Sequence, residues 1–101
     1  MIERIIEVLG SARQRKPMYL IHVDAASAED FLNGFELVCF ACGLEVPLEI
    51  RKQVTVERGW EWLAARPIEE MRKHGLGQEA IVDELFAIEI AVWEEWRVRR
   101  A

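Results

Sequence analysis

The residues whose spacing could support chemistry begin with Cys39 and Cys42, which form a C-x-x-C pair. Such a pair can cycle between dithiol and disulfide or supply two zinc ligands. A reactive pair usually lies at a helix N-terminus, whereas these cysteines end an apolar, helix-like stretch. A Cys₂His₂ zinc site would need both histidines of the chain, His22 and His74. We expect both cysteines to be buried, reduced and metal-free, with a metal site or redox activity as the alternatives.

Two acidic residues stand in apolar surroundings and could act at a site. Glu89 lies between Phe86 and Trp93, inside an apolar helical arc, and Glu36 is the only charge between Phe31 and Cys42. A buried acid is rarely left without a partner. We therefore expect Glu89 to pair with an arginine or another hydrogen-bond donor, with a role at an interface as the alternative.

The stretch from Gly75 to Ala80 matches the dinucleotide fingerprint G-x-G-x-x-A, which requires a preceding strand. Here the preceding residues, Pro67 to His74, read as a short helix, so we interpret the two glycines as helix ends. A helix-turn-helix is disfavoured because Glu79 and Asp83 would repel phosphates. No serine elbow, phosphate loop or His-Glu-x-x-His is present. We expect a non-enzyme with no catalytic residue, metal or cofactor.

The longest predicted element is a helix over residues 77–97. Its apolar residues recur at helical spacing along one stripe: Ile81, Leu85, Ile88, Val92 and Trp96, widened by Val82, Phe86 and Trp93. This arc is broader than packing on one core requires. We therefore expect a homodimer through this helix, with Trp93, Trp96 and Glu89 as interface candidates. The alternative is that both tryptophans pack within one subunit against Trp60 or Trp62.

Shorter elements precede this helix. Residues 2–14 form a first amphipathic helix that ends before a proline, and residues 18–23 read as extended. Ser27 resembles the start of a capping box, which begins a second helix that ends at Gly43. Because this helix is apolar nearly all round, we place it at the centre of the bundle. Residues 45–58 fit a strand or a helix, and we favour the helix.

These elements predict a mainly α fold, with a bundle of four or five helices in one domain spanning residues 1–101. The alternative is an α+β fold in which residues 18–23 pair with residues 48–56 as a short two-stranded element. Pairing of that kind would need both segments to be extended.

Charge and hydropathy restrict the class of partner. The net charge is −5, and residues 1–50 hold four basic against eight acidic side chains. A nucleic-acid binder normally presents a basic face, so we expect no nucleic-acid partner. The longest apolar run, residues 37–44, is too short to span a bilayer, and the acidic N-terminus is unlike a signal peptide. We expect no membrane association and a cytoplasmic location.

One local pattern resembles a known group of proteins. Residues 16–20, Lys-Pro-Met-Tyr-Leu, are followed by Phe-Leu-Asn-Gly-Phe at residues 31–35. This arrangement is similar to that of small, uncharacterised bacterial proteins. The resemblance implies a bacterial origin and carries no activity or site residue.

Together these observations favour a non-enzymatic protein–protein interaction module, acting as an acidic inhibitor or accessory of a basic partner. The alternative is a small-molecule or metal-binding protein with an apolar pocket, for which Glu89, Cys39 and Cys42 are candidate polar groups. Exposure of Trp93 and Trp96 separates these hypotheses, because exposed rings favour a partner surface.

Overall fold

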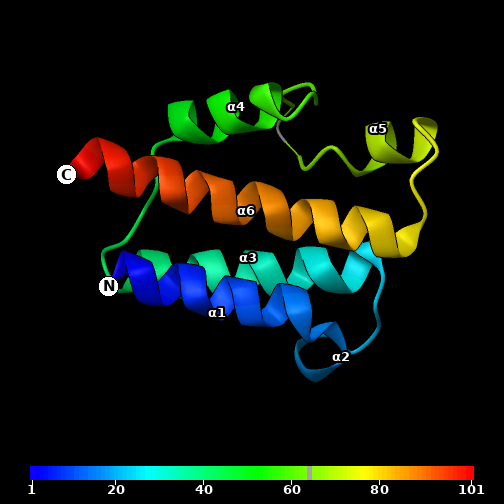
Figure 1. The fold of residues 1–101 in the computed structure, drawn as a ribbon, viewed down its shortest axis with the longest axis horizontal. Helices are drawn as coiled ribbons and strands as arrows, with labels where there is room; N and C mark the ends of the chain where they lie inside the picture. Colours follow the sequence, from blue (N-terminus) through cyan, green and yellow to red (C-terminus); the bar gives the residue numbers. More distant parts are fainter. Residues whose placement is uncertain (64) are drawn as a thin grey trace.

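The long C-terminal helix is the element against which most of the others pack. The computed structural model describes residues 1–63 and 65–101. Its six helices in the described residues are α1 (Ile2–Gln14), α2 (Lys16–Tyr19), α3 (Ala25–Ala41), α4 (Leu48–Glu57), α5 (Ile68–Lys73) and α6 (Gln78–Arg100). Figure 1 shows α6 running between α4 and α5 on one side and α1 and α3 on the other. The prediction of a mainly α fold with a long C-terminal helix is confirmed, and the α+β alternative is wrong because the described residues contain no strand.

The core follows the predicted stripes of α1 and α6. On α1, Ile2, Ile5 and Leu9 are buried, as the helical spacing requires. On α6 the buried residues include Ile81, Leu85, Phe86, Val92 and Trp93. Four other helices contact α6, so most of its broad arc is covered within one chain, and Ile88, Ala91 and Trp96 are the arc residues that stay partly exposed. The dimer through this helix stays a prediction.

The expectation that residues 18–23 are extended is wrong in its first half. Pro17 lies in the first turn of α2, where its missing N–H costs nothing and its fixed φ suits a helix. The amide of Leu20 donates to Lys16 O (2.9 Å), which closes that turn. Residues 21–24 then form a bend that leads into α3. No strand forms because the proposed partner, residues 48–56, lies within helix α4.

α3 begins earlier than the capping box predicts and ends as predicted. Asp24 is the N-cap, and its carboxylate accepts a hydrogen bond from the amide of Ser27 at 2.9 Å. At the other end, Gly43 has φ 81°, and the amide of Leu44 donates to Cys39 O at 2.8 Å. These are the features of a glycine-terminated helix.

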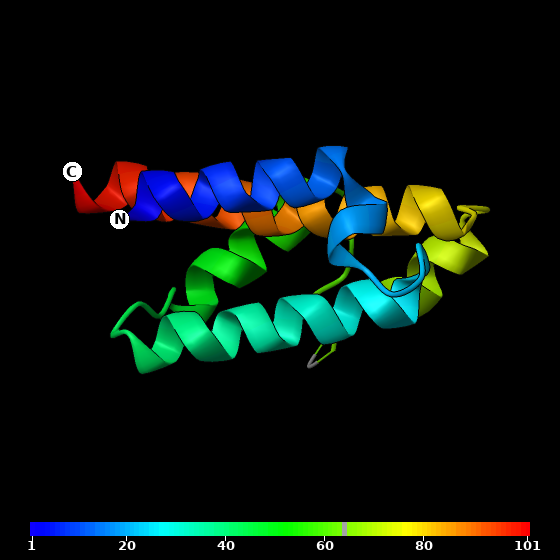
Figure 2. The same ribbon diagram turned by 90° about the horizontal axis from the view of Figure 1, so that it is seen from below.

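The prediction that α3 lies at the centre of the bundle is wrong. Leu37, Val38 and Phe40, in its C-terminal half, are 68%, 63% and 59% exposed. Within residues 1–63 and 65–101, α6 is the helix that four others contact extensively, whereas α3 packs chiefly on α6. Figure 2 shows α3 along one edge of the molecule, opposite α1 and α6, which run side by side along the other. The apolar composition of α3 therefore does not determine whether the helix is buried.

Candidate functional site

Glu89 anchors a charged network between α4 and α6. It is 3% exposed, and its two carboxylate oxygens accept hydrogen bonds from Arg51 at 3.0 and 3.2 Å. The indole Nε1 of Trp93, one turn along α6, donates to the same carboxylate at 2.9 Å. The prediction that Glu89 pairs with an arginine or another donor is confirmed. A planar guanidinium facing a carboxylate in this way is a strong and geometrically specific pair.

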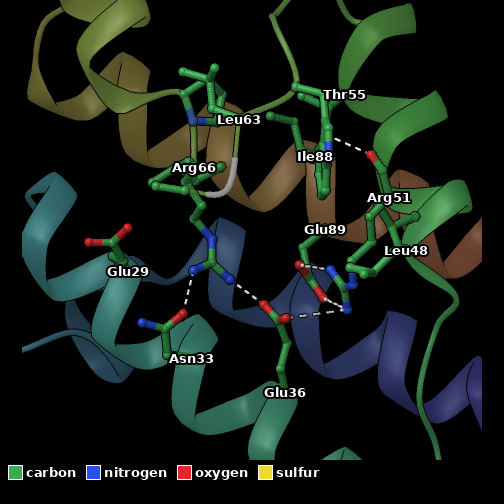
Figure 3. Close-up of a pocket in the computed structure, with 15 residues that line it drawn as sticks. Glu29, Asn33, Glu36, Leu48, Arg51, Thr55, Leu63, Arg66, Ile88 and Glu89 are labelled. Carbon is green, nitrogen blue, oxygen red and sulfur yellow. Dashed lines mark hydrogen bonds and ion pairs between the residues drawn. The ribbon is translucent and has the colours of Figure 1, made fainter.

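Glu36 of α3 joins this pair to a second arginine. Its carboxylate lies 3.4 Å from Arg51 and also accepts from Arg66, which in addition donates to the side-chain oxygen of Asn33. Burial raises the pKa of the Glu36 carboxyl, and the nearby charge of Glu89 raises it further, although both arginines oppose the shift. Two acids and two arginines from three helices and one connecting segment therefore share one site (Figure 3).

This network borders a cavity of about 480 Å³, in the range of small-molecule sites. Its apolar lining includes Leu48, Trp62, Leu63, Leu85, Ile88 and Val92. The charged lining comprises three carboxylates, from Glu29, Glu36 and Glu89, and two guanidiniums, from Arg51 and Arg66. The described lining therefore carries one net negative charge, and its groups converge from α3, α4, α6 and the segment between α4 and α5.

The cavity side of α3 continues into exposed apolar surface. Glu29, Asn33, Glu36 and Phe40 lie on one ridge of the helix because they are three or four residues apart. The first three line the cavity, and Phe40 is the next member beyond it. Leu37 beside this ridge and Leu48 at the cavity are 68% and 71% exposed. We call Leu37, Phe40 and Leu48 the apolar rim.

The predicted interface residues of α6 are mostly inside the chain. Trp93 is 1% exposed, and Glu89 is buried beside it. Trp96 is half-buried, and its ring centroid lies 5.8 Å from that of Trp93. The guanidinium of Arg100 lies over the Trp96 ring, with its central carbon 4.7 Å from the ring centroid. The Trp93 ring is therefore not accessible to a partner protein. Among the ring contacts of the described residues, neither Trp93 nor Trp96 packs against Trp60 or Trp62.

The cysteines and histidines do not form a site. Cys39 is buried, which raises the pKa of its thiol, but Cys42 is exposed, so the expectation of two buried cysteines is wrong for Cys42. Both are free thiols. His22 lies exposed in the bend after α2, and His74 ends α5 with its ring against Trp60. Among residues 1–63 and 65–101, no three His, Cys, Asp or Glu side chains converge on a metal position.

Sequence reasoning found the acids of this site and missed their partners. Glu36 and Glu89 were recognisable as single charges in apolar stretches, but Arg51 and Arg66 stand among ordinary polar neighbours. They lie 38 and 30 residues from the acids they contact. Local periodicity carries no signal for pairs so far apart in the chain. The cavity itself depends on the same distant contacts.

Comparison of the chain with family models, with curated proteins and with solved structures finds no match. The resemblance of residues 16–35 to small bacterial proteins stays a prediction. Within the described residues, no helix combines the length and the apolar character needed to cross a membrane.

Proposed function

We propose that this protein is a non-enzymatic interaction module that binds a basic protein partner through the apolar rim and the acid-rich cavity beside it. The supporting observation is the exposure of Leu37, Phe40 and Leu48 next to a cavity whose lining carries excess negative charge. Large apolar side chains grouped on a surface mark interaction sites more often than single exposed ones do. This surface replaces the α6 tryptophans as the binding region.

Charge indicates the chemistry of the partner. The chain has a net charge of −5, and the exposed carboxylates of Glu45 and Glu49 precede and follow Leu48. A basic partner would be steered toward such a surface, and its association rate would fall as salt screens the attraction. A second copy of this chain would present the same acidic groups. A basic protein is therefore the occupant that we propose.

The experiment compares the wild type with a Leu37→Ser/Phe40→Ser double variant as immobilised baits. Val98→Ser is the matched control, because Val98 is similarly exposed, at 65%, on α6. A protein retained by the wild type and the control but lost from the double variant is purified and titrated against all three. We expect a basic protein whose association rate falls at least tenfold between low and 0.3 M salt, on the order of known steered complexes.

Two outcomes would overturn the proposal. One is equal retention of all proteins by the wild type and the double variant. The other is sedimentation showing that the wild type forms a dimer which the double variant abolishes, because the apolar rim would then be covered by a second copy. A dimer that the double variant leaves intact would support the proposal, since the rim would still be free.

The cavity favours small-molecule binding as a second candidate function. Its polar groups are the acids and arginines of the network rather than Cys39 and Cys42, so the metal-binding form of this hypothesis gains no support from the described residues. Retained ligand in native mass spectrometry of the purified protein would support it, and a mass equal to that of the bare chain would count against it.

A further inference from the structure

The polar end of the cavity already holds a guanidinium, supplied by the chain itself. Arg66 comes from the segment between α4 and α5, where the described residues have no helix or strand. Its guanidinium reaches α3 and donates to Asn33 and Glu36, the central members of the cavity ridge (Figure 3). The side chain of Arg66 is 20% exposed, so the contact is shielded from solvent. A planar cation therefore fits between these two acceptors.

The ridge also carries a carboxylate, that of Glu29, with which Arg66 forms no ion pair. Glu29 lines the same cavity one turn before Asn33 and is in no ion pair among the described residues. Arg51 is shared between two acids, because both carboxylate oxygens of Glu89 accept from it and Glu36 lies 3.4 Å away. The cavity lining as a whole therefore has three carboxylates, Glu29, Glu36 and Glu89, against the two guanidiniums of Arg51 and Arg66, which leaves one carboxylate in excess.

The remaining walls suit the stem of a cation rather than a second polar group. Trp62 and Leu63 line the cavity from the segment that carries Arg66, and Leu48 lines it from α4. An aromatic ring and aliphatic side chains pack well along a hydrocarbon stem, and a ring face also attracts a cation. The cavity volume of about 480 Å³ leaves room for such a stem.

We propose that the Glu29–Asn33–Glu36 ridge is an exchangeable binding site for a guanidinium or ammonium group on an apolar stem, at which Arg66 is the intramolecular occupant. The ligand is either an arginine or lysine side chain of a protein or a free organic cation. The first source rests on the proposed function, because it assigns the basic partner's side chain to this cavity. Binding of the cation itself does not depend on that function.

Arg66 and an external cation compete for the same acceptors. A group tethered by a short chain has an effective concentration of roughly millimolar or more. An external ligand therefore binds only to the fraction of molecules in which Arg66 has left the ridge, and its apparent affinity is reduced by that fraction. Removal of the Arg66 side chain should expose the site and strengthen binding of the external cation.

The test titrates n-butylguanidinium into the ¹⁵N-labelled wild type and Arg66→Ala, followed by amide chemical shifts. We expect binding at least tenfold tighter to Arg66→Ala, with shifts at residues 29–36. The neutral n-butylurea, of similar shape, should give no saturable shifts. In the Arg66→Ala background, Glu36→Gln should weaken binding at least tenfold, whereas Asp30→Asn, on α3 but off the ridge, should not. Circular dichroism checks folding, and Arg66→Gln repeats the test if Arg66→Ala loses helix.

Equal affinity of both proteins for n-butylguanidinium, or equal binding of n-butylurea, would overturn the proposal. N-acetyl-arginine methylamide distinguishes the sources. If it binds at least as tightly as n-butylguanidinium, the ligand is a side chain of a protein. If only n-butylguanidinium binds, the ligand is a free cation. The cation site is then supported, but a basic partner protein would not place a side chain in this cavity.

Discussion

Replacing Glu89 by alanine should be among the most destabilising single changes in this chain. Glu89 is 3% exposed, and its loss leaves the Arg51 guanidinium and the Trp93 indole N–H without their carboxylate. Breaking a buried ion pair by removing one member costs about 3–5 kcal/mol. Glu36 remains 3.4 Å from Arg51 and partly compensates its charge, so we expect a loss of about 3 kcal/mol, at the low end of that range.

Glu89→Leu should be better tolerated than Glu89→Ala. Leucine fills most of the volume that alanine leaves empty, and a cavity in a core adds its own cost. Both variants leave the same donors without a partner, at a cost of about 1–3 kcal/mol. We therefore expect Glu89→Leu to be more stable than Glu89→Ala by about 1–2 kcal/mol. Replacing both members, as Arg51→Met/Glu89→Leu, should recover part of the lost stability because no buried guanidinium is left unpaired. The remaining cost should be about 1–3 kcal/mol, from the unpartnered Trp93 N–H.

Urea unfolding followed by far-UV circular dichroism measures these differences, because fluorescence would also report the changed surroundings of Trp93. A double-mutant cycle between Arg51 and Glu89 gives their coupling energy. In thermal unfolding, a loss of 3 kcal/mol corresponds to a fall in Tm on the order of 12 °C or more in a domain of this size. A Glu89→Ala variant as stable as the wild type, or more stable than Glu89→Leu, would refute the reasoning, as would additive effects of the two sites.

Three further predictions concern charge and thiol reactivity. The pKa of Asp83 is lowered to about 2, chiefly by its hydrogen bond with Arg13, so this carboxylate stabilises the fold above pH 3.8 and the contribution is lost as the pH falls toward 2. Urea midpoints of Asp83→Asn should therefore fall less steeply than those of the wild type over that range, and identical slopes would contradict this. Burial raises the pKa of Glu36 above 4.5, so the folded state holds this proton more tightly than the unfolded state does. The free energy of unfolding should therefore fall as the pH rises through and above 4.5, and Glu36→Gln should remove that fall in the same assay. Cys42 should react rapidly with a maleimide in the native protein and Cys39 only on unfolding, as peptide mass mapping would show, and equal rates would contradict the burial of Cys39.

The helices were predictable where one face of the sequence is repeatedly apolar. The stripes of α1 and α6 contain most of their buried residues, because helical spacing directly determines which side chains share a face, and Ile88 and Trp96 of the α6 stripe are partly buried. Gly43 ended α3 as predicted, since its positive φ suits glycine better than any other residue. In contrast, residues 18–23 have β-favouring side chains but no strand beside them, and β propensity depends on such neighbours.

The position of α3 and the site were not predictable by the same means. Leu37 and Phe40 are apolar yet largely exposed, and exposure depends on which helices pack nearby rather than on residue type. Glu36 and Glu89 were visible as isolated acids, whereas Arg51 and Arg66 reach them only through the folded chain. The cavity and its charge therefore required the structure.

The measurement that tests the binding surface most directly is amide chemical-shift mapping of the ¹⁵N-labelled wild type during titration with the blocked peptide acetyl-Leu-Arg-Leu-amide. This peptide combines the basic and apolar groups that the surface should recognise. We predict saturable shifts at residues 29–40 of α3 and around Leu48, and these shifts should become smaller when salt is added. Shifts clustered instead at Trp96 and the outer side of α6, or no saturable shifts at all, would contradict it.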